Sequence, residues 1–188
     1  MISKQALRKQ IKESKRATPV ATLAQWSQQA VHFLEQEICW QRAKKVLLYY
    51  SMNDEVDTRK LVERAYQAGK IIYLPVMNDD ILVLRPFTGK QHMKCATKYK
   101  ILEPTGKIVP PTHYQNIDLV IVPGVAFTCE GERLGRGKGY YDKLLPLISA
   151  PKIGICWESQ IVDQLPTEPH DIPLDGIISS KGTIKSIK

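Results

Sequence analysis

The sequence lacks several features that define large classes of protein. It has no apolar run near the ~20 residues needed to cross a bilayer. Its first residues, MISKQALRKQIKESKR, are basic but lack the apolar core of a secretory signal. The four cysteines form no C-x-x-C pair, and none stands near a histidine at metal-ligand spacing. We therefore expect a cytoplasmic protein with free thiols, no zinc site and no membrane partner.

The charge balance favours an anionic partner. A net charge of +8 suits nucleic acid, a membrane surface or phosphorylated small molecules, and composition does not choose among them. The basic residues form no single long run, and we find no aromatic RNA-binding motif or helix-turn-helix. The three kinds of anionic partner therefore stay open at this point, and the missing motifs count mildly against a nucleic-acid-binding module.

The most informative segment is RLGRGKGYYD at residues 133–142. It alternates glycines with cations: Gly135, Arg136, Gly137, Lys138 and Gly139. Glycines let the backbone approach a ligand closely, and clustered cations repel one another unless an anion lies between them. The pattern predicts a phosphate-binding loop that opens into a helix, with Asp142 placed to meet a phosphate-bound Mg²⁺. The G-x-G-x-G spacing matches neither a Walker A loop nor a dinucleotide fingerprint, so a solvated surface loop is the alternative.

Apolar periodicity predicts the secondary structure. Helices are expected over residues 4–17, 19–37 (with Thr18 as N-cap), 58–68 and 140–148. Strands are expected over residues 46–50, 71–74, 81–84, 119–122, 153–156 and 176–179, with Pro75 ending the second. Residues 88–116 are polar and rich in turns, which predicts a long connection; the tail after residue 179 carries no prediction.

The order of these elements predicts an α/β fold. Strands alternate with helices at βα spacing, so we expect one domain over residues 1–188. It would be an open, mostly parallel twisted sheet with helices on both faces, a Rossmann-like three-layer arrangement. Ligands of such sheets lie beyond the carboxyl ends of the strands. Polar segments follow predicted strands there, at residues 50–58, 123–142 and 157–160.

The run DLVIVPGVAFTCEGERLGRGKGYYDKLL at 118–145 closely resembles the signature of 5-formyltetrahydrofolate cyclo-ligases, also called 5,10-methenyltetrahydrofolate synthetases. Other family-like segments occur in the family's order: K-x-x-L-R at 4–8, EVDT at 55–58, EP at 103–104 and LPTEPHD at 165–171. The resemblance spans nearly the whole chain. One departure is Thr128, where the family often has aspartate.

The resemblance implies an ATP- and Mg²⁺-dependent cyclisation of 5-formyltetrahydrofolate. ATP phosphorylates the formyl oxygen on N5, N10 attacks the activated carbon, and phosphate leaves. The products are 5,10-methenyltetrahydrofolate, ADP and phosphate. The implied partners are small molecules only, with polyglutamylated folates left open, and we expect a monomer. Phosphoryl transfer depends mainly on positioning and charge neutralisation, so no side-chain nucleophile is required.

The resemblance also assigns site residues. The catalytic residues would be Arg136 and Lys138. The ATP-binding residues would be Lys4, Arg8, Arg133, Leu134, Gly135, Arg136, Gly137, Lys138, Gly139, Tyr140 and Tyr141. The substrate-binding residues would be Tyr50, Glu55, Tyr140 and Trp157, and the metal ligands would be Asp142 and Asp171.

Each assignment has a structural alternative. Lys4 and Arg8 share a helical face and could be solvated, and Glu55 could be an exposed loop acid. Trp157 could equally be a packing residue. Asp142 suits the start of a helix, and the HDIP segment that contains Asp171 is turn-like.

Overall fold

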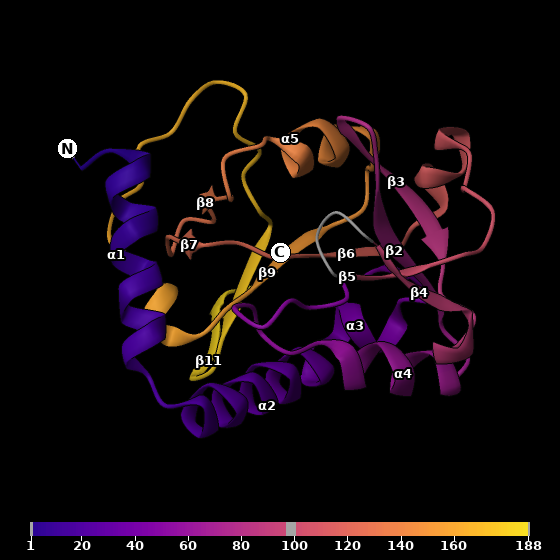
Figure 1. Ribbon diagram of the computed structural model, residues 1–188, viewed down its shortest axis with the longest axis horizontal. Helices are drawn as coiled ribbons and strands as arrows, with labels where there is room; N and C mark the ends of the chain where they lie inside the picture. The colour runs from indigo at the N-terminus through magenta and orange to yellow at the C-terminus, as the bar shows by residue number, and fades with distance from the viewer. Residues whose placement is uncertain (1, 97–100, 188) are drawn as a thin grey trace.

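The computed structural model describes residues 2–96 and 101–187. Its centre is a seven-stranded sheet with the order β11-β10-β9-β6-β1-β2-β3 (Figure 1). The strands are β1 (Lys45–Leu47), β2 (Ile71–Asn78), β3 (Ile81–Pro86), β6 (Leu119–Val122), β9 (Lys152–Ile155), β10 (Gly176–Ser179) and β11 (Gly182–Lys185). The inner strands pair in parallel, from β10 through β9, β6 and β1 to β2. The edge strands β3 and β11 pair antiparallel with their neighbours.

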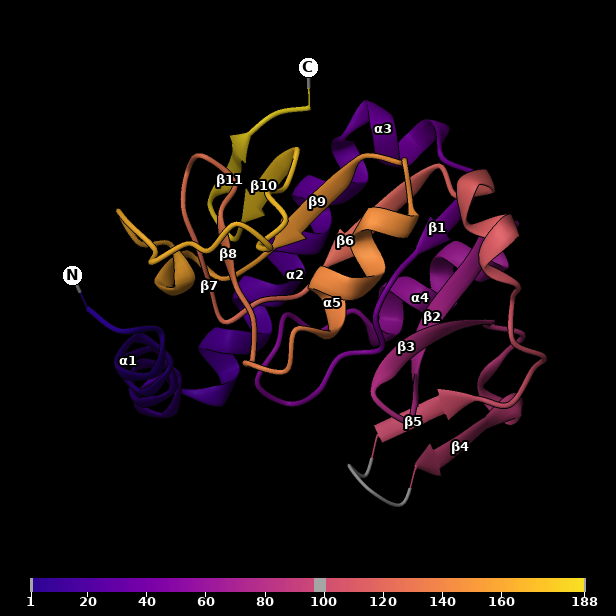
Figure 2. The same cartoon turned by 90° about the horizontal axis from the view of Figure 1, so that it is seen from above.

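Helices cover both faces of this sheet, as predicted. On one face lie α2 (Val20–Gln36), α3 (Ile38–Arg42) and α4 (Arg59–Gln67); on the other lie α5 (Tyr140–Leu144) and the 3₁₀ helices η2 (Pro111–Asn116) and η3 (Leu145–Leu147) (Figures 1 and 2). Side chains of a strand point alternately to the two faces. Accordingly, Leu119 and Ile121 of β6 join the core under α2 and α4, whereas Val120 and Val122 join the core under α5.

The first helix, α1 (Lys4–Ala17), lies beside the sheet (Figure 1). Its two buried residues, Leu7 and Ile11, pack on Ala126 and Leu134. The latter belong to a short hairpin of β7 (Ala126–Phe127) and β8 (Arg133–Leu134), which leads directly into the glycine loop. Packing therefore fixes α1 against the segment that carries the loop.

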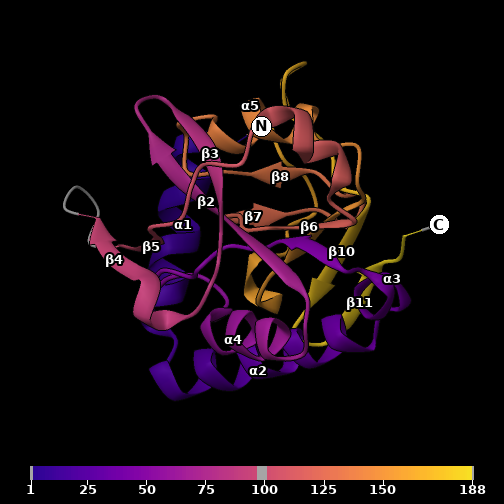
Figure 3. The same ribbon diagram turned by 90° about the vertical axis from the view of Figure 1, so that its right-hand side faces the viewer.

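The region 88–116 was wrongly predicted as a connection. Its described residues hold η1 (Lys90–His92), β4 (Met93–Ala96), β5 (Ile101–Pro104) and η2. The strands β4 and β5 pair antiparallel in a separate two-stranded sheet beside the β2–β3 edge of the central sheet (Figure 3). The part of this prediction at residues 97–100 lies outside the described residues.

Several predicted boundaries also need correction. Strand β2 runs through Pro75 to Asn78, because beyond Tyr73 it pairs only with β3 and the missing proline N–H faces no partner strand. Thr18 is the C-cap of α1 rather than the N-cap of α2. The helix expected over 140–148 is α-helical only to Leu144 and continues as η3. None of the helices in residues 2–96 and 101–187 has the length and apolarity of a membrane span, and the four cysteines are free.

Candidate active site

A cleft of about 510 Å³ lies at the carboxyl ends of β1 and β2. Its walls come from the segment after β1, the β2–β3 hairpin, β5, the glycine loop, the start of α5, the start of α1 and residues 168–171. Every residue that the sequence assigns to the site lines this cleft, with the exception of Trp157. The fold therefore brings the predicted folate and ATP residues to one place.

The glycine loop bends where its glycines permit. Gly137 and Gly139 have φ angles of 99° and 65°, a left-handed region that side-chain-bearing residues rarely adopt. A Cβ on Gly137 would also lie 3.3 Å from the Cζ atom of Arg8. Arg8 donates through Nε to the Gly135 carbonyl at 2.8 Å. Helix α1 thus holds the loop by a hydrogen bond as well as by apolar packing.

Arg133 lies beneath the loop rather than on its surface. Its side chain is 3% exposed, and it donates to Asp142 Oδ1 at 2.6 Å. Its guanidinium also lies 5.7 Å from the ring centroid of Tyr141. Burial raises the pKa of the Tyr141 hydroxyl, with the charge of Glu55 acting in the same direction. This cluster anchors the start of α5 to the loop.

Arg136 crosses the cleft to the segment after β1. It donates to Asp54 at 2.6 Å and to Glu55 at 3.1 Å. Burial disfavours the charge on Asp54, but the hydrogen bond and charge of Arg136 outweigh it and lower the pKa of Asp54. The same carboxylates raise the pKa of Arg136 despite its desolvation.

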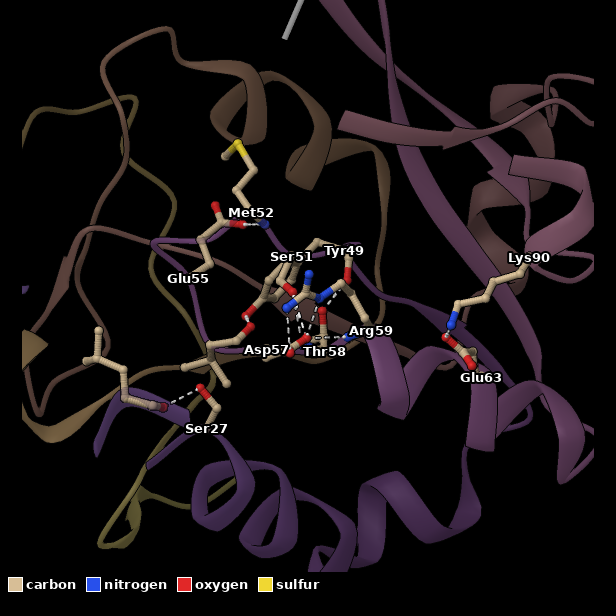
Figure 4. Close-up of polar contacts among 12 residues, drawn as sticks. Ser27, Tyr49, Ser51, Met52, Glu55, Asp57, Thr58, Arg59, Glu63 and Lys90 are labelled. Carbon is tan, nitrogen blue, oxygen red and sulfur yellow. Dashed lines mark hydrogen bonds and ion pairs between the residues drawn. The ribbon is translucent and has the colours of Figure 1, made fainter. Parts of the chain in front are cut away.

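Glu55 is held within its own segment and faces the cleft. Its side chain is 8% exposed and accepts the Met52 N–H through Oε2 at 2.9 Å (Figure 4). Thr58, the residue before α4, donates through Oγ1 to the Tyr49 carbonyl instead of capping the helix with its side chain. These contacts fold the segment back on β1, so Glu55 is a nearly buried carboxylate rather than an exposed loop acid.

Lys4 connects α1 to residues 168–171. Its Nζ lies 2.6 Å from Glu168 and 2.8 Å from Asp171. Partial burial opposes the charge of Lys4, but the two carboxylates raise its pKa. The hydrogen bond from Lys4 lowers the pKa of Glu168, and it also lowers the pKa of Asp171 against the effect of burial.

Ligand atoms of Glu168, His170 and Asp171 all lie within 4.8 Å of one another, which is close enough to share a metal ion. Asp142 also lines the cleft, but one of its oxygens accepts the Arg133 N–H. The two predicted metal ligands therefore differ: Asp171 belongs to a group of candidate ligands and pairs with the partly exposed Lys4, whereas Asp142 is the partner of the buried Arg133.

The remaining predicted residues also have clear positions. Tyr50 and Tyr140 are half-buried in the cleft wall, and Leu134 is buried there. Burial raises the pKa of Tyr50. Lys138 is exposed, and the contacts of the described residues include no ion pair to it.

Trp157 requires a correction. It is 1% exposed, packs in the core under α2 and donates through Nε1 to Ser27 Oγ at 2.9 Å. It does not line the cleft, so the packing interpretation is the one the geometry supports. Thr128, the departure from the family pattern, is buried and its Oγ1 accepts the Glu132 N–H, so it stabilises the turn before β8.

Sequence reasoning missed Asp54 and Glu168 as members of the charged network. Asp54 precedes the EVDT segment, and two adjacent acids facing a basic loop could have signalled a bridge. Glu168 stands in the family-like segment LPTEPHD but was given no role. Both contacts join residues distant in sequence, which local patterns do not encode.

Comparison with known proteins shows the family of this chain. The model of the 5-formyltetrahydrofolate cyclo-ligase family matches residues 1–180. The 5-formyltetrahydrofolate cyclo-ligase of Escherichia coli strain K12 is 33% identical, over 73% of this chain and 78% of that protein. The NMR structure of the Aquifex aeolicus 5,10-methenyltetrahydrofolate synthetase superposes with a TM-score of 0.86 at 30% identity, covering 98% of this chain and 93% of the other.

The synthetase of Mycoplasma pneumoniae has the same fold, with a TM-score of 0.75 at 26% identity, over 95% of this chain and 99% of the other. The match therefore extends over sequence and structure along nearly the full chain. The chain belongs to the 5-formyltetrahydrofolate cyclo-ligase family and is an enzyme of the ligase class.

Proposed function

We propose that the cleft cyclises 5-formyltetrahydrofolate to 5,10-methenyltetrahydrofolate with ATP as co-substrate. The γ-phosphoryl group passes to the formyl oxygen on N5 and ADP leaves. The N10 nitrogen then attacks the activated carbon and loses its proton, and the C–O bond breaks to release phosphate with the former formyl oxygen. The ring closes without a covalent bond to the protein.

One observation carries this proposal. A single cleft is lined by a cation-rich glycine loop and by the nearly buried carboxylate of Glu55, and Arg136 of the loop pairs with that carboxylate. Phosphoryl transfer between two bound molecules requires their reacting groups to be held together, and positioning supplies much of the catalysis. A cleft with only one of these features would fit a binding protein equally well.

The ATP end of the cleft is the glycine loop with the start of α1. Arg136 and Lys138 would neutralise the charge that builds on the transferring phosphoryl group. Lys138 is exposed, and the described contacts give it no ion pair, so it is ready to meet an anion. Lys4 and Arg8 reach the same cleft from α1. Arg133 supports the loop from beneath, as its burial and its bond to Asp142 indicate.

The folate end is centred on Glu55. A carboxylate accepts a pair of parallel N–H donors well, and the pterin ring presents such a pair. Apolar side chains that include Met52, Leu74 and Leu82 line the adjacent wall, where the flat ring would pack. Tyr50 and Tyr140 would contact the substrate from the cleft wall.

Magnesium fits the residues at 168–171. Mg²⁺ prefers oxygen ligands and usually keeps phosphate oxygens and waters as well. The carboxylates of Glu168 and Asp171 lie close together and supply this chemistry. All three carboxylates already accept from a cation, but Lys4 beside Glu168 and Asp171 is 23% exposed, whereas Arg133 beside Asp142 is 3% exposed, so Asp142 is the harder one to free for a metal. When bound, Mg²⁺ would neutralise phosphate charge. A single domain over residues 1–188, a monomeric state, a cytoplasmic location and a lack of nucleic-acid or membrane partners stay predictions.

The test is an assay for the methenyl product, which has its own absorbance. Purified protein should form it only when 5-formyltetrahydrofolate, ATP and Mg²⁺ are all present, with one phosphate released per product. Product formed without ATP would exclude the proposed chemistry. Well-folded protein that forms no product under any of these conditions would refute the proposal. Steeply salt-dependent binding to generic duplex without ATP turnover would instead favour the nucleic-acid alternative.

A further inference from the structure

Lys15 stands out among the lysines of α1. It lies near the end of the helix and is half-buried, and its Nζ donates to the Asp54 carbonyl at 2.9 Å. The same Nζ lies 5.2 Å from the ring centroid of Trp157. Burial lowers the pKa of Lys15, and the charge of Asp54 opposes that shift. Burying an ammonium group costs free energy that a solvated lysine does not lose, so the contact between Lys15 and Asp54 needs a compensating benefit.

Lys15 contacts Asp54, the residue that links the segment after β1 to the glycine loop. The Asp54 carbonyl accepts from Lys15, and the Asp54 carboxylate accepts from Arg136 at 2.6 Å. The next residue, Glu55, accepts from Arg136 at 3.1 Å. Helix α1 and the glycine loop therefore hold one short segment from two sides.

Helix α1 also holds the glycine loop itself. Arg8 donates to the Gly135 carbonyl at 2.8 Å, about two helical turns before Lys15. One rigid helix thus contacts the main chain of both segments that face each other across the cleft. This arrangement fixes the separation between the carboxylate of Glu55 and the glycine loop.

We propose that Lys15 is a positioning residue for catalysis, which holds the 52–57 segment so that Glu55 meets the folate and Asp54 orients Arg136. The inference rests on the proposed function of Glu55 and Arg136. Lys15 itself acts only through the segment it holds, because it does not line the cleft. The competing explanation is that Lys15 only covers the ring of Trp157.

The test compares three variants. Lys15→Met keeps the apolar stem over Trp157 but removes the N–H donor and the charge. Lys15→Arg keeps both. Lys12→Met removes a charge from an exposed position on the same helix and is the matched control. We would measure kcat and KM for both substrates, and hydrogen–deuterium exchange of residues 52–57 without ligand.

We expect Lys15→Met to raise the KM for 5-formyltetrahydrofolate about tenfold, as the loss of a hydrogen bond from a charged group should. Amide exchange in 52–57 should become faster, Lys15→Arg should restore both readouts in large part, and Lys12→Met should match the wild type. A Lys15→Met enzyme with wild-type KM values and wild-type exchange would overturn the inference. So would one whose only change is a lower melting temperature, because loss of the ammonium over the Trp157 ring can lower stability without releasing the segment. If the wild-type protein forms no methenyl product, the proposed function fails, and the exchange experiment still reports whether Lys15 holds the segment.

Discussion

The buried pair of Arg133 and Asp142 gives the sharpest prediction, because it separates two roles for Asp142. The sequence suggests a metal ligand, whereas the structure pairs this carboxylate with a guanidinium whose side chain is 3% exposed. The Arg133 Nε has no hydrogen-bond partner among the described residues, so Asp142 supplies much of the compensation for this charge. Asp142→Asn keeps the size of the side chain and removes its charge.

The expected cost follows from the burial of the pair. Removing one partner of a buried ion pair typically costs about 3–5 kcal/mol, because the other charge stays buried without compensation. Asparagine keeps an acceptor oxygen and the Asp142 side chain is 17% exposed, so we expect the low end of this range. In a protein of this size a loss of about 3 kcal/mol corresponds to a melting temperature roughly 6–12 °C lower.

The assay is urea unfolding in the presence of EDTA, where no metal can contribute. Asp142→Asn should lose about 3 kcal/mol there, and adding Arg133→Met should recover part of the loss because it removes the uncompensated charge. If Asp142 acts as a metal ligand, the variant should instead unfold like the wild type in EDTA and need more Mg²⁺ for activity. That second pattern would refute the ion-pair reasoning.

The remaining predictions concern single residues of the cleft. Glu55→Gln should weaken folate binding about tenfold and leave ATP binding unchanged by calorimetric titration, since the amide loses the charge and one acceptor; equal weakening of both would point to a collapsed segment. Lys138→Ala should lower kcat roughly a hundredfold while the melting temperature stays unchanged, because the side chain is exposed; normal turnover would leave phosphate binding to the backbone alone. Arg136→Ala should lower kcat similarly and also speed amide exchange in 52–57, and wild-type exchange would show that this bridge does not hold the segment. The hydrogen bond from Arg59 lowers the pKa of Asp57 to about 2. The ionised Asp57 therefore stabilises the folded protein fully above the ordinary pKa near 3.8, and this stabilisation is lost as the pH falls through 2. Asp57→Asn should therefore cost about 1 kcal/mol at pH 7, after allowance for solvent screening. The difference from wild type in urea unfolding should shrink as the pH falls toward 2 and vanish below it; a difference that persists there would show that the cost comes from lost hydrogen bonds.

The fold was predictable where local signals were strong. Helix α1 has a clear apolar stripe of Leu7 and Ile11, and β6 is a run of four apolar residues, buried throughout. The missed strands are short hairpin strands of two to four residues, and each pairs with a strand next to it in the sequence. The pair β7 and β8 has two residues each, which leaves no periodicity to read. Strand β2 passes through Pro75 because its partners change along its length, and no local rule anticipates that.

The site was predictable to the extent that it is local. The glycine loop is recognisable from ten consecutive residues, and it lines the cleft together with Glu55. The pairing of charges was not predictable, because Arg136 and Asp54 are 82 residues apart and Lys4 and Asp171 are 167 apart. The direction of the Trp157 side chain was also not predictable from local sequence. Its position after a strand suggested the cleft, but its ring packs in the core against α2.

Burial decides which cations of the cleft can exchange their partners for a phosphate. Arg136 is 46% exposed and its partner Asp54 is 54% exposed, and an ion pair near solvent typically stabilises by about 0–1 kcal/mol. A polyanion can therefore displace the Asp54 carboxylate from Arg136 at little cost, and Lys4, 23% exposed, is intermediate. Arg133 cannot exchange its carboxylate partner for a phosphate in this way, because separating it from Asp142 would leave both charges poorly compensated. Substrate binding should thus rearrange Arg136 and engage Lys138 while the Arg133–Asp142 pair stays intact as the fixed base of the loop.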